Sequence, residues 1–127
     1  PAESAAGVGA PLGGTHWILA ELEGVAVELG AGENAPHLVL DGESSRLSGS
    51  GGCNRLVGSY EVGDDGLRFG QIASTRMACS DAVMEREAAF LAALGAVTGH
   101  RLDGSSLLLL DGDRVRARLT SAAAEIS

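Results

Sequence analysis

The chain has 127 residues, enough for one domain with its own hydrophobic core and too few for two. Seventeen acidic residues oppose nine arginines and no lysine, so the formal net charge is -8. Because phosphate groups repel such a chain, we expect no nucleic-acid partner. No stretch approaches the roughly 18 apolar residues that span a bilayer, so we expect no transmembrane segment in the chain given.

The two ends of the chain differ in composition from its middle. Residues 1–14 are mostly Ala and Gly without a periodic apolar face, and residues 121–127 are similar. We therefore expect a flexible flank over 1–14, a folded domain over 15–120 and a flexible tail over 121–127. Such a flank is typical of an exported protein that has lost a signal peptide or a lipid-bearing leader. A start codon directly before Pro1 would contradict that hypothesis.

Short apolar runs bounded by turn residues predict strands at 16–22 and 36–41. Residues 55–72 then predict a hairpin with its turn at Asp65-Gly66. Near the carboxyl end, residues 100–120 predict a three-strand meander with turns at Asp103-Gly104 and Asp111-Gly112. Asp64 and Asp65, and Asp111 and Asp113, are also possible calcium ligands, but the pattern favours hairpin turns. We expect no metal site and no cofactor.

Residues 80–97 carry the only convincing helical pattern. Ser80 or Asp81 can cap its start, and Gly95 can close it in the left-handed conformation. One side is apolar at helical spacing, with Glu87 as its single interruption. This helix must pack on the sheet. Aromatic residues are only 3% of the chain, and we expect all four to be at least partly buried: Trp17, Tyr60, Phe69 and Phe90.

The last predicted strand alternates between charged and apolar side chains. Its two faces carry Arg114, Arg116 and Arg118 on one side and Val115, Ala117 and Leu119 on the other. The arginine face has two interpretations, a surface for an anion or an acidic partner and an ordinary solvated face. We favour the solvated face, because charge on one side of a strand is usual in a half-buried sheet.

Several short motifs follow one another along the chain: WILAELEG at 17–24, SGSGGCNR at 48–55, GSY at 58–60 and STRMAC at 74–79, before the helix. In this order the chain resembles the META domain family, over about residues 15–120. The two cysteine motifs, at this separation and with a helix directly after them, are the specific part. The motif residues are Trp17, Gly52, Cys53, Asn54, Arg55, Gly58, Tyr60, Thr75, Arg76, Met77 and Cys79.

The resemblance implies an α+β fold, in which an antiparallel sheet curls into a partly open β-barrel packed on one α-helix. It also implies export or lipid anchoring in the bacterial cell envelope, and one heat-inducible member implies a link to stress. Family members often carry an aromatic residue where this chain has His100.

The two cysteines, 26 positions apart, allow several kinds of chemistry. A catalytic thiol needs a neighbouring His, and the three histidines lie in predicted strands without an evident third group. A zinc site needs closely spaced ligand pairs, which the chain lacks. A redox pair needs both thiols in one turn. A disulfide between Cys53 and Cys79 remains, with buried free thiols as the alternative in a reducing compartment; we favour the disulfide.

The residues beside the cysteines fit an architectural role. Gly51 and Gly52 would let backbone approach backbone, Asn54 would bond to nearby main chain, and Met77 would fill an irregular gap.

Arg55 and Arg76 flank the two cysteines, and a disulfide would bring them together as a small anion site. The alternative is that each pairs with an acidic neighbour such as Asp81 or Glu85, which is the more common arrangement.

These observations favour a non-catalytic binding or structural module of the bacterial envelope, with an envelope protein or a small apolar ligand as partner. Two alternatives stay open. One is a carrier that holds a small apolar molecule or lipid inside the barrel. The other is an enzyme that uses Cys53 or Cys79 with a histidine.

Overall fold

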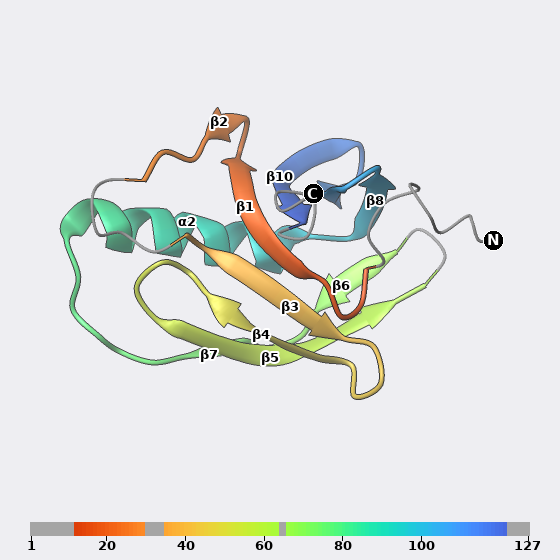
Figure 1. The fold of residues 1–127 in the computed structure, drawn as a ribbon, viewed down its shortest axis with the longest axis horizontal. Helices are drawn as coiled ribbons and strands as arrows, with labels where there is room; N and C mark the ends of the chain where they lie inside the picture. Colours follow the sequence, from red (N-terminus) through yellow and green to blue (C-terminus); the bar gives the residue numbers. More distant parts are fainter. Residues whose placement is uncertain (1–11, 30–34, 64–65, 122–127) are drawn as a thin grey trace.

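The computed structural model describes residues 12–29, 35–63 and 66–121, and Figure 1 shows the fold. The elements, in chain order, are β1 (His16–Leu22), β2 (Val25–Ala26), β3 (His37–Asp41), β4 (Arg46–Ser50), β5 (Arg55–Val62), β6 (Leu67–Phe69), β7 (Ala73–Ser74), α2 (Asp81–Ala96), β8 (Gly99–Asp103), β9 (Ser106–Asp111) and β10 (Arg114–Ser121). The helix α2 is not long and apolar enough to cross a membrane.

Eight strands form a nearly closed antiparallel barrel in the order β6-β5-β4-β3-β1-β10-β9-β8, with β2 and β7 added to β1 and β5. The barrel almost closes where Gly66 and Gly99 form an isolated antiparallel bridge. Beside this bridge, the Leu67 N–H donates to the Thr98 carbonyl at 3.2 Å. The expected α+β fold with a partly open barrel is therefore confirmed.

The core lies between the barrel strands and α2, which packs against β1, β6 and β10 (Figure 1). Trp17 and Phe90 are its largest side chains, and both are fully buried. Tyr60 is also buried and Phe69 is half-buried, as predicted for all four aromatic residues. The indole N–H of Trp17 donates to the Leu12 carbonyl at 3.0 Å, so a residue from the predicted flank contacts the core. The boundaries at 15 and 120 stay a prediction.

The helix α2 begins as predicted and ends differently. The Ser80 hydroxyl accepts a hydrogen bond from the Val83 N–H at 3.3 Å, which confirms the amino-terminal cap. The prediction for Gly95 is wrong, because Gly95 lies inside the helix, which ends at Ala96. The next residue, Val97, is extended and 3% exposed. Burial of Val97 in the core carries the chain straight into β8 without a left-handed turn.

The hairpins are confirmed where the structure describes them. Gly104 and Gly112 have φ values of 62° and 63°, as the turns of the β8-β9-β10 meander require. In the β5-β6 hairpin, the predicted turn residue Asp65 lies outside the described residues.

The strand β4 is a strand that sequence reasoning missed. It pairs with β3 and β5 and has one large apolar residue, the buried Leu47. Gly49 faces Leu38 of β3, and a side chain there would collide with the His37 carbonyl oxygen.

Candidate functional site

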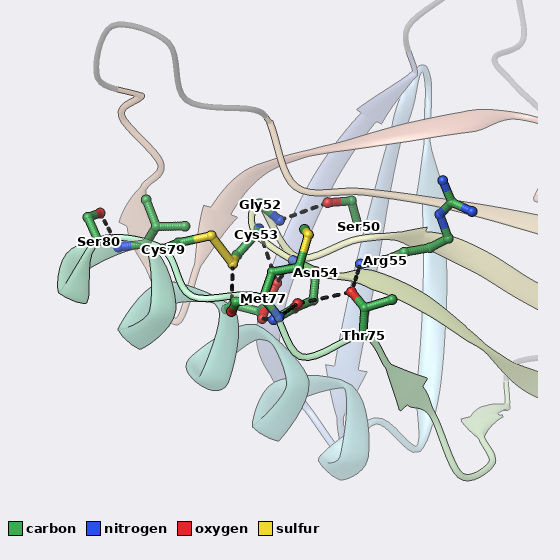
Figure 2. The surroundings of a disulfide bond; sticks show 11 residues. Ser50, Gly52, Cys53, Asn54, Arg55, Thr75, Met77, Cys79 and Ser80 are labelled. Carbon is green, nitrogen blue, oxygen red and sulfur yellow. Dashed lines mark hydrogen bonds between the residues drawn. A yellow bond between two sulfur atoms is a disulfide. The ribbon is translucent and has the colours of Figure 1, made fainter.

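A disulfide joins Cys53 and Cys79, whose Cα atoms are 6.1 Å apart (Figure 2). Cys53 lies in the loop between β4 and β5, and Cys79 directly precedes Ser80, the cap of α2. The bond therefore ties this loop to the start of the helix. Both cysteines of the chain are used, so the disulfide prediction is confirmed and the alternative of buried free thiols is wrong.

Next to the disulfide, the loop residues 51–54 bind the carboxylate of Glu87, which lies on α2. Glu87 Oε2 accepts hydrogen bonds from the backbone N–H groups of Cys53, at 3.1 Å, and Asn54, at 2.6 Å. Glu87 Oε1 accepts a third from the Asn54 side-chain amide at 2.7 Å. The Glu87 side chain is buried, so three donors replace the water that it loses on folding.

The two glycines ahead of Cys53 make room for this contact. A Cβ atom on Gly51 would lie 2.6 Å from Glu87 Oε2, so any side chain there would displace the carboxylate from its donors. Gly52 has a φ of 107°, which side chains rarely allow, and its N–H donates to the Ser50 hydroxyl at 3.0 Å. The expected approach of backbone to backbone occurs at Gly51, whose N–H donates to the Asn54 carbonyl at 3.1 Å, but the space that a side chain would need is taken by the Glu87 carboxylate.

Asn54 joins the loop to a third segment, residues 75–79. Its Oδ1 accepts hydrogen bonds from the Thr75 hydroxyl at 2.9 Å and from the Met77 N–H at 2.7 Å (Figure 2). Thr75 Oγ1 in turn accepts from the Arg55 N–H at 3.0 Å. The sequence predicts that Asn54 bonds to nearby main chain; one of its side-chain partners is a main-chain N–H, but all three lie more than 20 positions away in the sequence. Met77 is 55% exposed, so it does not fill a gap as predicted.

The loop 51–54, the segment 75–79 and the helix thus form one unit, which we call the Glu87 clamp. Every side-chain oxygen and nitrogen of Glu87 and Asn54 has a hydrogen-bond partner. The clamp holds the loop between β4 and β5 against α2. Sequence reasoning found both cysteines and Asn54 but missed the role of Glu87, whose one signal was an acidic residue on an apolar helix face.

The arginines beside the disulfide are exposed. Figure 2 shows the side chain of Arg55 pointing away from the sulfur atoms. Within the part of the chain that the structure describes, no ion pair joins Arg55 or Arg76 to Asp81 or Glu85. The anion site at this pair stays a prediction.

The arginines of β10 are paired with acidic residues. Arg116 contacts Glu23 and Asp111 at 2.9 Å each, and hydrogen bonds to Glu23 and then Asp111 raise its pKa above the ordinary value. Arg118 contacts Glu21 at 3.1 Å, and Arg114 contacts Glu23 at 3.3 Å. This pairing favours the solvated-face interpretation of the stripe.

The predicted alternation on β10 fails at one position. The pairing register with β9 shifts between Val115 and Ala117, and Val115 is 41% exposed. Such a shift turns side chains away from their expected face. Ala117 and Leu119 are buried as predicted.

The remaining motif residues are also structural. Trp17 and Tyr60 lie in the core, and a Cβ atom on Gly58 would lie 3.0 Å from the Gln71 carbonyl oxygen. The three histidines lie on β1, β3 and β8, and none belongs to the Glu87 clamp. The rings of His16 and His37 are 4.5 Å apart.

The class of domain is defined by an antiparallel barrel with one packed helix and by a disulfide that links the β4-β5 loop to the start of that helix. The chain belongs to the META domain family, whose model matches residues 10–124. A solved NMR structure of a protein from Burkholderia xenovorans is 31% identical, with a TM-score of 0.64 over 87% of this chain and 83% of that chain. A second NMR structure, 23% identical, has the same fold with a TM-score of 0.66 over 91% and 93%. None of the curated proteins compared with the chain matches it.

Proposed function

We propose that the protein is a non-catalytic binding or structural module of the bacterial cell envelope. The observation that carries the proposal is the Cys53–Cys79 disulfide, which is built into the Glu87 clamp. Disulfides form and persist in oxidising compartments and are rare in the cytosol. The disulfide therefore supports a location outside the cytoplasm, and the similar Burkholderia structure supports a bacterial setting.

A non-catalytic role is supported by the use that the fold makes of its reactive groups. Both thiols are joined, so the enzyme alternative lacks its nucleophile while the disulfide is intact. The Glu87 carboxylate is occupied by three donors of the chain itself. An envelope protein is the partner that we propose. Fully buried side chains such as Trp17, Phe90 and Leu94 fill the space between sheet and helix, which weakens the apolar-carrier alternative.

A thiol count tests the disulfide part of the proposal. The chain is secreted to an oxidising compartment, and its intact mass is measured after alkylation with and without reductant. We expect no alkylation before reduction and two added groups after it. Closing a loop of this length stabilises a fold by about 3.5 kcal/mol in the chain-entropy estimate, so urea unfolding after reduction should show a loss of that size. The Cys53→Ala/Cys79→Ala variant is the control, and reductant should leave its stability unchanged.

Fast alkylation of one cysteine in the native protein would contradict the disulfide and favour the thiol enzyme. Cell fractionation tests the location separately. An antibody to the domain should detect the natural gene product in the envelope fraction of the source bacterium, and detection in the cytoplasm alone would contradict the envelope proposal.

A further inference from the structure

The strand β8 lies at one end of the barrel's strand order, and beyond Gly99 its outer edge pairs with no strand in the part of the chain that the structure describes. It pairs with β9 along its whole length, from Gly99 to Asp103. On its other side, the bridge between Gly66 and Gly99 contacts only the first residue. Because β6 is antiparallel to β8, it continues alongside the residues that precede Gly99. An open cleft of about 890 Å³ borders this edge, lined in part by His100, Arg101 and Leu102.

The backbone of β8 presents hydrogen-bonding groups along this edge. The Leu67 N–H donates to the Thr98 carbonyl, so Gly66 and Gly99 face each other as a pair that is not itself hydrogen-bonded. The backbone groups of Gly99 then point toward β9. Since these groups alternate in direction along a strand, the N–H and C=O of Leu102 point to the outer edge. Within the described ranges no strand covers them.

The side chains of Arg101, Leu102 and Asp103, along this edge, are exposed. Arg101 and Asp103 lie on one face of the strand, opposite Leu108 and Ser106. Neither forms an ion pair with any residue that the structure describes. Leu102 lies on the other face opposite the fully buried Leu107, and is nevertheless 41% exposed. It is a core-facing leucine left half uncovered at the rim of the barrel.

We propose that this edge binds a second copy of the chain. Two β8 strands pair antiparallel with Leu102 opposite the partner's Leu102, and each Leu102 N–H donates to the carbonyl of the other. Arg101 of each copy then faces the partner's Asp103, and the symmetry makes this contact twice. The tripeptide Arg101-Leu102-Asp103 is therefore complementary to a second copy of itself that runs in the opposite direction. A twofold interface requires such self-complementarity.

The charges also fix the register of this pairing. A shift that centres the pair on Arg101 would place two arginines opposite each other, which is destabilising. In the register centred on Leu102, both leucine side chains lie on the same face and can pack together. The self-association does not depend on the proposed function. A five-residue edge buries far less than the roughly 1,600 Å² of a standard interface, so the association is weak and depends on concentration.

Sedimentation velocity over a concentration series tests the proposal with the whole oxidised chain. The wild type should approach a dimer as its concentration rises toward about 1 mM, the range of a weak complex. Arg101→Glu makes the edge wholly acidic, and Asp103→Arg makes it wholly basic, so each variant alone should associate at least tenfold more weakly. An equimolar mixture of the two restores both contacts and should associate as the wild type does.

Two charge reversals on the exposed β5-β6 pair, Arg68→Glu and Glu61→Arg, are matched controls and should leave association unchanged. Equal melting temperatures will show that the variants are folded. Amide hydrogen exchange gives a second readout, since the Leu102 N–H should exchange more slowly at high concentration. A wild type that stays monomeric to about 1 mM overturns the proposal. The proposal is also overturned if the single variants associate as the wild type does, or if their mixture stays monomeric. It is overturned as well if the edge binds only extended peptides of other proteins.

Discussion

Three neutral donors hold the buried carboxylate of Glu87, and two of them are backbone N–H groups of the loop 51–54. Hydrogen bonds to a charged group contribute about 1.5–3 kcal/mol each, which offsets the cost of burying the charge. The donors depend on the acceptor in turn, because a buried N–H without a partner costs about 1–3 kcal/mol. The clamp is therefore sensitive to a change of a single atom.

Asn54→Asp makes such a change, replacing the side-chain donor with an acceptor. The new carboxylate would face Glu87 oxygen at the 2.7 Å separation of the present hydrogen bond. We expect a loss of about 3 kcal/mol in the free energy of unfolding, measured by urea denaturation at neutral pH.

Adding Glu87→Gln to that variant should recover most of the loss. The glutamine oxygen accepts the two backbone N–H groups, and its NH₂ group donates to the new aspartate. Glu85→Gln on the exposed side of the same helix is the control, and it should recover nothing. Equal stability of Asn54→Asp with and without Glu87→Gln would show that the two side chains are not coupled.

The clamp shows what sequence can predict at the scale of single residues. The disulfide was predictable because both partners are cysteines and the chain has only two. The Glu87 contact was not, because its partners lie 33 and 34 positions away and two of them are backbone groups that no side-chain pattern marks.

At the scale of elements, Gly95 near the end of α2 and Gly104 in the β8-β9 turn differ in whether the backbone requires glycine. Gly95 lies in the helix, and a Cβ atom there would meet nothing within 4 Å. Gly104, in the β8-β9 turn, has equally open surroundings but a φ of 62°.

Gly95→Ala should therefore stabilise the protein by about 0.5–1 kcal/mol, since alanine restricts the unfolded chain and fits the helix. Gly104→Ala is the matched control and should destabilise it, because its conformation disfavours a side chain. Thermal and urea unfolding measure both. If Gly95→Ala destabilised the protein instead, that result would support the left-handed cap that the sequence predicted.

Elements with a regular apolar pattern were predictable and β4 was not. The helix has apolar residues at helical spacing behind a serine cap, and the β8-β9-β10 meander has a continuous leucine run between two turn glycines. The sequence RLSGS of β4 has one large apolar side chain, Leu47, so it shows no alternation. It becomes a strand because β3 and β5 pair with it on both sides, which is tertiary context that a local pattern does not contain.

At the scale of the whole molecule, stability in alkali depends on one residue. Burial, and to a lesser extent the charge of Asp41, raise the pKa of Tyr60 above its ordinary value. The chain has no lysine and no other tyrosine, and both cysteines are bonded, so little else titrates near pH 10.

A pKa that is higher in the folded state means that the unfolded chain loses its proton first. The free energy of unfolding should stay level below about pH 10 and fall as pH rises through the folded pKa. Tyr60→Phe should remove most of this fall, measured by urea unfolding from pH 8 to 12. Parallel curves for the two proteins would contradict the assignment.

The pairing of β1 with β10 determines when the barrel can close. Strand β1 pairs with β3 on one side, but its partner on the other side is β10, where Trp17 lies opposite Ser121 at the far end of the domain. Strands β3, β4 and β5 and both cysteines come earlier in the chain. If the chain crosses a membrane amino terminus first, as the envelope proposal implies, it presents both disulfide partners while β1 still has an open edge. During that interval the half-built sheet is exposed to aggregation, and an early disulfide shortens the search for the last strand.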